Sequence, residues 1–496
     1  MSFNAATFFV DRHVSEGRGR AAAFRHAGHT ITCAEVAERV SRAANALATL
    51  GVEVEDRVLL ALDDSPAFVA AFWGAAKLGA IAVPVNTVMA VEDYAFLLND
   101  SRAKIVVAEA SITATLRAAG QESPWLRTIL TSDELARLMA KAPSDCAAVA
   151  TVDDDAMYWG YTSGSTGRPK AAVHSHRDFV AAADLVGVGV FGLRPEDVVL
   201  SVSKMFFAFG LGNSLYFPQR VGATAVLVPE RLTPERIFEV IRAERPTVLF
   251  AVATVYARML HVAGPEHRDL SSLRLCISSG EALPPAVFDA WKARFDHELH
   301  DVVGSTEALH DFIANRPGAV RRGSAGQIIP GFEARLVDDA GNPVPMGTVG
   351  HLLIKGPTTS PYYWNRRERT RATMLGEWLR TGDMFSQDTE GYFYFAGRSD
   401  DMLKVRGLWV SPVEIEAVLA GHPAVVEAAV VGRPDGDGLV KPHAFVVLRT
   451  GQQAAESDLK AFVRERLAGY KVPERIDVVD DLPKTATGKI VRFRLR

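Results

Sequence analysis

Short apolar runs alternate with helical stretches from the N-terminus to about Gly331, and this alternation restricts the possible fold more than any other feature. Ser65 and Pro66 have the pattern of a helix cap followed by proline in the first turn. The expected elements are a helix over 33–50, a strand over 57–62, a helix from 66 to 77, and strands over 80–85 and 104–108. Strands separated by helices predict a parallel sheet covered by helices, so this part should be α/β.

Beyond Gly331 the pattern changes to short alternating segments separated by turn signals at 338–343 and 388–391, which predict hairpins. After Asp400 it changes again, to a helix over 412–420, strands over 425–432 and 442–448, and a helix over 456–467. We therefore expect an α/β protein with two domains. Residues 1–399 should form a large N-terminal domain of helix-covered sheets with a β-rich subdomain, and residues 400–496 a small α+β C-terminal domain.

The composition is that of a globular protein. Of 496 residues, 48% are hydrophobic and 23% are charged, and the formal net charge of −4 gives no reason to expect a nucleic acid or a membrane as partner. No signal peptide or membrane span is apparent. The cysteines, Cys33, Cys146 and Cys276, lack metal-type or redox-type spacing, which predicts reduced thiols in a cytoplasmic protein.

The segment Tyr161–Lys170 (YTSGSTGRPK) combines small residues, hydroxyls and glycines with two cations at its end. Glycine lets backbone N–H groups approach a polyphosphate closely, and the cations offset its charge. The segment lacks the Gly-Lys-Ser/Thr ending of a Walker A loop. It therefore predicts a phosphate-binding loop of another kind.

Five short motifs follow one another along the chain in the order Tyr161–Lys170, Gly304–Glu307, Thr381–Asp383, Gly397–Asp400 and Pro483–Lys489. Together they resemble the adenylate-forming enzymes, which include acyl- and aryl-CoA ligases, the adenylation domains of peptide synthetases and beetle luciferases. The resemblance extends over essentially the whole chain. It implies that a carboxylic acid is activated with ATP and Mg²⁺ as an acyl-adenylate and then transferred to a thiol, such as that of CoA.

The resemblance also implies roles for individual residues. Those expected around the ATP phosphates are Thr162, Ser163, Ser165, Thr166 and Lys170. Those expected along the adenine and acyl groups are Ser279, Gly280, Glu281, Ala282, Asp301, Ser305 and Thr306. Asp383 would accept hydrogen bonds from the ribose hydroxyls with Arg398 nearby, and Glu307 would help to hold Mg²⁺, an ion that prefers oxygen ligands.

Three further roles fall in the C-terminal part. Lys489 resembles the catalytic lysine that contacts the oxygens around the α-phosphate, where a cation stabilises developing negative charge. Asp400 matches the hinge about which the small domain turns between the two half-reactions. Gly407 and Trp409 would border the channel for the thiol.

The segments 204–213, 304–310 and 361–365 resemble benzoate–CoA ligases. This implies an acid pocket formed by Phe209, Gly210, Gly304 and His310 that favours a planar aryl acid over a long chain. A phenylalanine cluster is also common in a core, and His310 could equally be a satisfied buried histidine.

The chain departs from this pattern at four positions. Val303 stands where an aromatic residue is frequent, Phe209 where a tyrosine is expected, Ala253 where proline is frequent, and Asp311 where an apolar residue is usual. The ring substituent stays open: benzoate, 2-aminobenzoate and hydroxybenzoate are all candidates.

The expected function is an ATP-dependent aryl acid–CoA ligase that releases AMP and pyrophosphate, as a monomer or homodimer. The alternative is a free-standing adenylation enzyme that loads an aryl acid onto a carrier protein. A luciferase-like oxygenase shares the first step, but no sequence feature requires oxygen chemistry.

Overall fold

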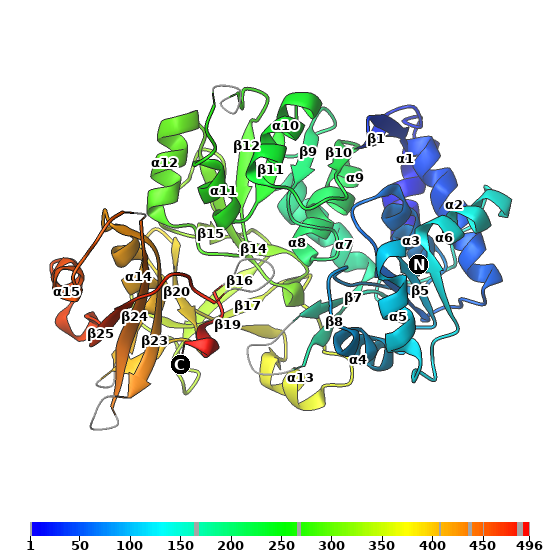
Figure 1. The fold of residues 1–496 in the computed structure, drawn as a ribbon. Coiled ribbons are helices and arrows are strands. Elements are labelled where there is room, and N and C mark those ends of the chain that lie inside the picture. Colours follow the sequence, from blue (N-terminus) through cyan, green and yellow to red (C-terminus); the bar gives the residue numbers. More distant parts are fainter. Residues whose placement is uncertain are drawn as a thin grey trace.

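The α/β fold class predicted from the alternating pattern is confirmed in a computed structural model of the chain (Figure 1). The structure describes residues 2–162, 168–264, 269–405, 408–434, 439–449, 451–483 and 490–495. Two large sheets organise the N-terminal part. A smaller antiparallel sheet follows, and the C-terminal residues form a separate group of strands and helices at one end of the molecule (Figure 1).

The first sheet has six strands in the order β6-β5-β3-β4-β7-β8. Its strands are parallel except β8, which pairs antiparallel with β7. Their bounds are β3 (Arg57–Ala61), β4 (Ile81–Pro84), β5 (Ile105–Ala108), β6 (Thr128–Thr131), β7 (Ala156–Thr162) and β8 (Lys170–Ser175). Thr162 and Lys170, which flank residues 163–169 of the predicted phosphate loop in sequence, pair at the edge of this sheet.

The second sheet has nine strands in the order β15-β14-β13-β12-β11-β9-β10-β1-β2. Strands β13, β12, β11, β9, β10 and β1 are mutually parallel, so their carboxyl ends share one edge. The bounds are β1 (Ala22–His26), β2 (His29–Thr32), β9 (Val198–Ser201), β10 (Thr224–Leu227), β11 (Val248–Ala251), β12 (Leu275–Ser278), β13 (Leu299–Gly304), β14 (Asp311–Ala314) and β15 (Gln327–Ile328).

Helices fill the space between the two sheets and cover their outer faces. The shared core joins side chains of both sheets to α2, α3, η3 and η4, while α10, α11 and α12 cover the nine-stranded sheet and α4 and α5 the six-stranded one. The α-helices are α1 (Arg12–Ser15), α2 (Cys33–Thr49), α3 (Pro66–Lys77), α4 (Val91–Ser101), α5 (Thr113–Gly120), α6 (Ser132–Lys141), α7 (His176–Ala182), α8 (Ala208–Leu211), α9 (Phe217–Val221), α10 (Pro234–Glu244), α11 (Ala253–Met259) and α12 (Pro285–Phe295). Short 3₁₀ or π segments are η1 (Thr7–Asp11), η2 (Ala110–Ile112), η3 (Ala183–Val188), η4 (Gly212–Tyr216) and η6 (Thr306–Ala308).

Helix α3 shows how the sequence specifies this layer. The Ser65 side chain accepts a hydrogen bond from the N–H of Phe68, and Pro66 occupies the first turn, as predicted. Nearly every residue of α3 is buried, which explains its uniformly apolar sequence. A Cβ at Gly74 would lie 2.9 Å from the Cβ of Ala43, so small residues let α2 and α3 pack closely.

The β-rich part and the C-terminal part complete the fold. The third sheet contains β16 (Glu333–Val337), β17 (Gly350–Lys355), β18 (Met374–Leu375), β19 (Trp378–Gln387) and β20 (Phe393–Arg398), with α13 (Arg367–Thr373) beside it. The last elements are β21 (Leu403–Val405), β22 (Leu408–Val410), α14 (Pro412–Ala420), β23 (Val425–Pro434), β24 (Val440–Leu448), α15 (Glu456–Arg464), η7 (Gly469–Lys471), β25 (Arg475–Val478) and η8 (Arg492–Arg494). These last elements enclose a core of their own, with buried members from Leu403 to Ile476.

The predicted elements agree with the structure except at their ends. Helix α15 ends at Arg464, before the predicted 467, and β24 begins at Val440 instead of 442. None of the helices in the described ranges combines the length and apolarity that crossing a membrane requires. Cys33, Cys146 and Cys276 are unpaired, as expected.

Candidate active site

The predicted phosphate loop joins two strands that are held in register. Thr162, at the end of β7, pairs with Lys170, at the start of β8. Ser163, Ser165 and Thr166 lie outside the described residues. The two ends of the loop are thus fixed at the edge of the six-stranded sheet.

Lys170 belongs to a cluster with Glu307 and Tyr363. Its Nζ donates a hydrogen bond to the Tyr363 hydroxyl at 2.6 Å, and that hydroxyl donates to Glu307 Oε1 at 2.6 Å. The Lys170 Nζ also lies 3.5 Å from Glu307 Oε1. The three side chains therefore form one network in which the tyrosine links the ammonium to the carboxylate.

Tyr363 reaches this cluster because its segment runs alongside β8. Ala172 pairs with Tyr363 in an isolated antiparallel bridge, and the Trp364 N–H donates to the Ala171 carbonyl at 3.0 Å. The Ser360 N–H donates to the Glu307 carbonyl at 2.7 Å. Backbone contacts thus hold the segment between β8 and η6.

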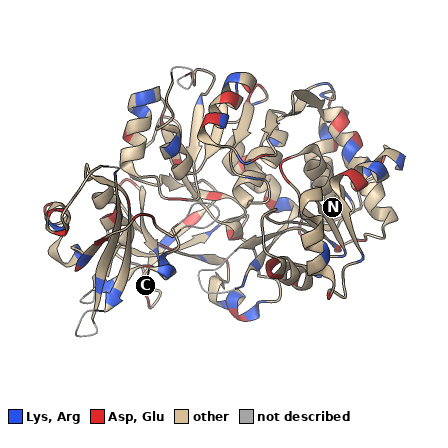
Figure 2. Ribbon diagram, in the orientation of Figure 1, with Lys and Arg blue, Asp and Glu red and all other residues tan. Residues whose placement is uncertain are grey.

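Burial shifts the titration of this cluster. Burial lowers the pKa of Lys170, and the nearby Glu307 carboxylate partly offsets this shift. Burial raises the pKa of Tyr363, and the same carboxylate adds to that shift. Arg369 of α13 also acts on Lys170 electrostatically. Positive residues dominate α13 in Figure 2, so this side of the cluster suits an anion.

Asp383 and Arg398 lie opposite each other on two neighbouring strands of the third sheet. They are register partners in β19 and β20, and Arg398 Nη1 donates to Asp383 Oδ1 at 2.8 Å. Gly382 has a φ of +78°, and a Cβ there would lie 2.9 Å from Arg398 Nη2. Burial alone would lower the pKa of Arg398, but the Asp383 carboxylate outweighs it and holds the pKa above its ordinary value.

The predicted residues 279–282 follow β12, at the edge where the parallel strands end. Ser279 Oγ donates to Asp311 Oδ1 at 3.1 Å. Glu281 accepts from the Thr254 N–H at 3.0 Å and from its hydroxyl at 2.7 Å. Gly280 and Ala282 are exposed, and Glu281 is half-buried.

The predicted residues of the next strand, β13, lie beside this loop. Asp301 is buried in β13, and burial raises its pKa well above the ordinary value. Gly304 ends β13, Ser305 follows it, and Thr306 and Glu307 begin η6. The Thr306 carbonyl accepts from His174 Nε2 at 2.7 Å, which fixes the start of that turn.

The predicted acid pocket is an aromatic cluster around His310. The ring centroids of Phe209 and Phe217 lie 5.5 and 4.4 Å from that of His310. His310 Nε2 lies 3.3 Å from the Phe209 carbonyl oxygen. A Cβ at Gly304 would lie 2.5 Å from the His310 carbonyl oxygen, and one at Gly210 would overlap the Lys204 carbonyl. Both glycines are therefore needed for close backbone packing around this pocket.

The C-terminal residues lie beyond β20. Asp400 is exposed in the turn after β20. Trp409 is in β22, where it pairs with Lys404 and packs near Met384 and Met402. Gly407 and Lys489 lie outside the described residues.

Two family models match this chain. The model described as AMP-binding enzyme matches residues 10–364, and the model described as AMP-binding enzyme C-terminal domain matches residues 414–489. The chain belongs to the AMP-binding enzyme family.

Individual members of the family are similar over their full length. The chain is 45% identical to the benzoate–CoA ligase of Thauera aromatica, over 100% of this chain and 96% of that protein. A crystal structure of the anthranilate CoA ligase AuaEII with anthranoyl-AMP matches with a TM-score of 0.95 at 39% identity, covering 100% of this chain and 96% of that one. A benzoate CoA ligase structure from Burkholderia xenovorans LB400 matches with a TM-score of 0.92 at 44% identity, covering 100% of both chains.

Sequence reasoning gave no role to two side chains that the structure places beside the predicted site residues. Tyr363 lay in a quoted motif but received no role, because its contact with Lys170 joins positions far apart in the chain. Tyr216 was not considered. It belongs to the π-helical segment η4, whose side-chain directions depart from the period of 3.6, so helical spacing did not indicate it.

Proposed function

We propose that this protein is an ATP-dependent aryl acid–CoA ligase that acts through an acyl-adenylate. The observation that carries the proposal is the short segment between β13 and β14. At one of its ends Glu307 contacts the Lys170–Tyr363 pair, and at the other His310 contacts Phe209 and Phe217. Groups suited to phosphates and groups suited to an aromatic ring are thus three residues apart.

In the first half-reaction, the substrate carboxylate oxygen attacks the α-phosphorus of ATP and pyrophosphate leaves. Lys170 offsets phosphate charge, and Asp383 accepts hydrogen bonds from the ribose hydroxyls while Arg398 keeps it ionised. In the second half-reaction, the thiolate of CoA attacks the acyl carbonyl and AMP leaves. The mixed anhydride replaces a poor leaving group by AMP, so no protein nucleophile is needed.

Mg²⁺ would accompany ATP, and the Glu307 carboxylate fits it as a hard oxygen ligand. Among the residues that the structure describes, no group of three or more His, Cys, Asp or Glu could hold a metal ion. The ATP phosphates would supply further oxygen ligands beside Glu307. Bound there, the ion would offset the charge that Lys170 alone cannot balance.

The domain boundary is part of the proposal. It lies at residues 399/400, with Asp400 as hinge, and the separate core that begins at Leu403 supports it. Lys489 would serve the first half-reaction, and Gly407 and Trp409 would border the thiol channel in the second. The protein would work in the cytoplasm, as a monomer or homodimer.

The deciding experiment measures acid-dependent pyrophosphate release with and without CoA. The acids are benzoate, 2-aminobenzoate, 2- and 4-hydroxybenzoate, phenylacetate and a medium-chain fatty acid. An aryl preference, turnover stimulated by CoA and an aryl-CoA product are expected. Release that CoA leaves unchanged would favour loading of a carrier protein, and a fatty-acid preference would overturn the assignment of the pocket.

A further inference from the structure

Three buried side chains beside the aromatic cluster have polar atoms without a hydrogen-bond partner. They are the Tyr216 hydroxyl, His310 Nδ1 and Asp311 Oδ2, and the three residues are 0%, 3% and 2% exposed. Within the described part of the chain, nothing else satisfies these atoms. Because an unpaired buried polar group is costly, such groups in a native protein indicate a bound water or ligand.

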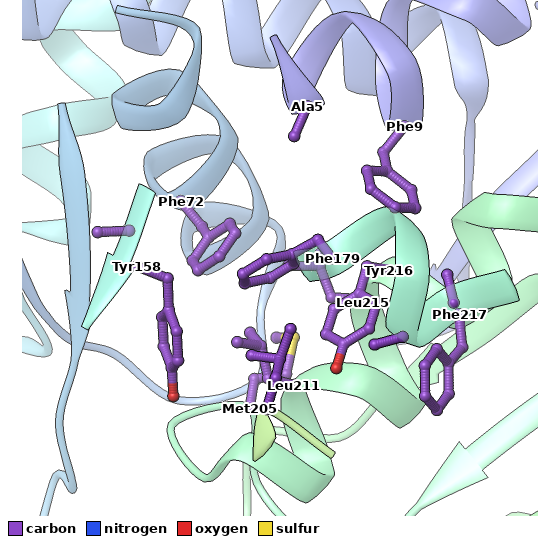
Figure 3. Packing of buried hydrophobic residues seen from close by; sticks show 14 of the residues in the cluster. Ala5, Phe9, Phe72, Tyr158, Phe179, Met205, Leu211, Leu215, Tyr216 and Phe217 are labelled. Atoms are coloured by element: carbon purple, nitrogen blue, oxygen red, sulfur yellow. The ribbon is translucent and has the colours of Figure 1, made fainter. Parts of the chain in front are cut away.

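The three side chains are neighbours, with the His310 ring between Tyr216 on its Nε2 side and Asp311 on its Nδ1 side. A Cβ added at Gly212 would lie 3.0 Å from the Tyr216 hydroxyl and 2.6 Å from His310 Nε2. His310 Nδ1 lies 2.9 Å from Asp311 Oδ2, but the pair lacks hydrogen-bond geometry. In Figure 3 the Tyr216 hydroxyl points away from Phe9 and toward the turn that carries Leu211.

Asp311 has one oxygen fixed and one available. Its Oδ1 accepts from Ser279 Oγ at 3.1 Å, and a Cβ at Gly304 would lie 2.7 Å from that oxygen. Asp311 also contributes, after burial and Tyr158, to raising the pKa of Tyr216, so its carboxylate acts on that hydroxyl. The free oxygen is therefore an acceptor beside the predicted pocket wall.

The available atoms define what the site can bind. A carboxylate oxygen only accepts when ionised, and a phenol and an imidazole can each donate or accept. An aromatic ring that carries an amino or hydroxyl group would supply a donor to Asp311. A hydrogen or methyl group at the same ring position would leave the three atoms unpaired.

We propose that Asp311, with Tyr216 and His310, forms a polar subsite that selects aryl acids bearing a hydrogen-bond donor on the ring. The inference rests on the proposed function, because it requires the ring to bind beside Phe209 and His310. It makes Asp311 a specificity-determining residue. The substrate class is amino- or hydroxybenzoates, and not benzoate itself.

The test compares acids that differ only in the donor. CoA-thioester formation is measured for benzoate and for the 2-, 3- and 4-isomers of aminobenzoate, hydroxybenzoate and methylbenzoate. The wild-type protein should use its best donor-bearing acid at least about 10-fold better, in kcat/KM, than the methylbenzoate of the same position. Equal use of the two acids would overturn the proposal and assign the three atoms to ordered water.

Variants locate the effect. Asp311→Leu should reduce that ratio to about 3-fold or less, and Asp311→Asn, which keeps an acceptor, should retain part of it. Tyr216→Phe should also lower the ratio. Tyr256→Phe is the matched control. The buried Tyr256 hydroxyl donates to the backbone carbonyls of Leu249 and Ile277, in the core under α10, α11 and α12, so its loss should leave the ratio unchanged.

The outcomes also separate this inference from the proposed function. If no acid yields a CoA thioester, the proposed function fails. If benzoate yields the thioester and substituents have no effect, only the donor-selective subsite fails. If Asp311→Leu does not fold, the wild-type panel and Tyr216→Phe still decide the matter.

Discussion

The two ends of the site satisfy their polar groups in different ways. At the phosphate end, Lys170, Tyr363 and Glu307 are bonded to one another, as are Asp383 and Arg398. At the acid end, the Tyr216 hydroxyl, His310 Nδ1 and Asp311 Oδ2 are buried without a hydrogen-bond partner, although His310 Nδ1 lies 2.9 Å from Asp311 Oδ2. A charged ligand that arrives at the first end must exchange existing partners, whereas a ligand at the second end supplies missing ones.

This contrast has a consequence for specificity. At the phosphate end, ATP replaces hydrogen bonds that the protein already makes, so the charged side chains of that end have partners before it binds. If the proposed subsite binds the ring, its buried atoms without hydrogen-bond partners would penalise any acid that does not complement them, and the acid end would discriminate among acids.

The largest effect is expected from Lys489→Ala. A single lost cation near developing charge costs roughly 10²–10³ in rate, so acyl-adenylate formation should fall by that factor. Thioester formation from supplied acyl-adenylate should remain largely intact. Pyrophosphate release and single-turnover CoA transfer measure the two steps, with Lys484→Ala as a control of equal charge change. Equal loss of both half-reactions would show that Lys489 does not act in adenylation alone.

Asp383→Asn should have the next largest effect. It removes the charge that Arg398 faces and one acceptor of the expected ribose contact. Hydrogen bonds to charged groups contribute about 1.5–3 kcal/mol, so the KM for ATP should rise about 10- to 100-fold. The KM for the acid should change little. Asp388→Asn, at the turn between β19 and β20, is the control; a matching rise there would point to general damage to the third sheet.

Tyr363→Phe isolates the hydroxyl that joins Lys170 to Glu307. Without it both charges lose a hydrogen bond, and kcat/KM for ATP should fall about 10-fold. The preference among aryl acids should not change, because that belongs to the other end. The exposed neighbour Tyr362 provides the control Tyr362→Phe. A changed acid preference in Tyr363→Phe would contradict the separation of the two ends.

Much of the phosphate end could be predicted because its residues lie in short motifs. Lys170, Glu307, Asp383 and Arg398 were each expected at the site, and the structure pairs them. The contact of Tyr363 with Lys170 and Glu307 could not be predicted, because it depends on how the segment that carries Tyr363 lies along β8. No local periodicity encodes such a long-range contact.

The acid end could be predicted less well. Phe209 and His310 were expected, and they do lie together. Tyr216 belongs to η4, a π-helical segment whose side-chain directions depart from the period of 3.6 that pattern analysis assumes. Asp311 was noted as a departure, but its free oxygen becomes apparent only once Ser279 is seen to bond the other one.

The smallest predicted effect concerns stability and a further buried carboxylate, Asp64. Its Oδ1 accepts from the Met205 N–H at 2.9 Å, in the segment that leads to Phe209. Burial raises its pKa from 3.8 to about 6, although Lys204 opposes and Asp63 adds to the shift. The native state therefore holds the proton at pH values where the unfolded chain has lost it, so stability falls as pH rises from 4 through 6.

Asp64→Asn should remove this pH dependence while keeping the acceptor for Met205. A pKa raised by about two pH units corresponds to about 3 kcal/mol. The free energy of unfolding of the variant should therefore exceed that of the wild type by up to about 3 kcal/mol at pH 8 and by little at pH 4. Urea unfolding of both proteins at the two pH values measures the difference. An equal gain in the free energy of unfolding at both pH values would mean that Asp64 is not a buried ionised carboxylate at neutral pH. A gain confined to high pH would show that the acid end tolerates a stability cost that the paired charges of the phosphate end avoid.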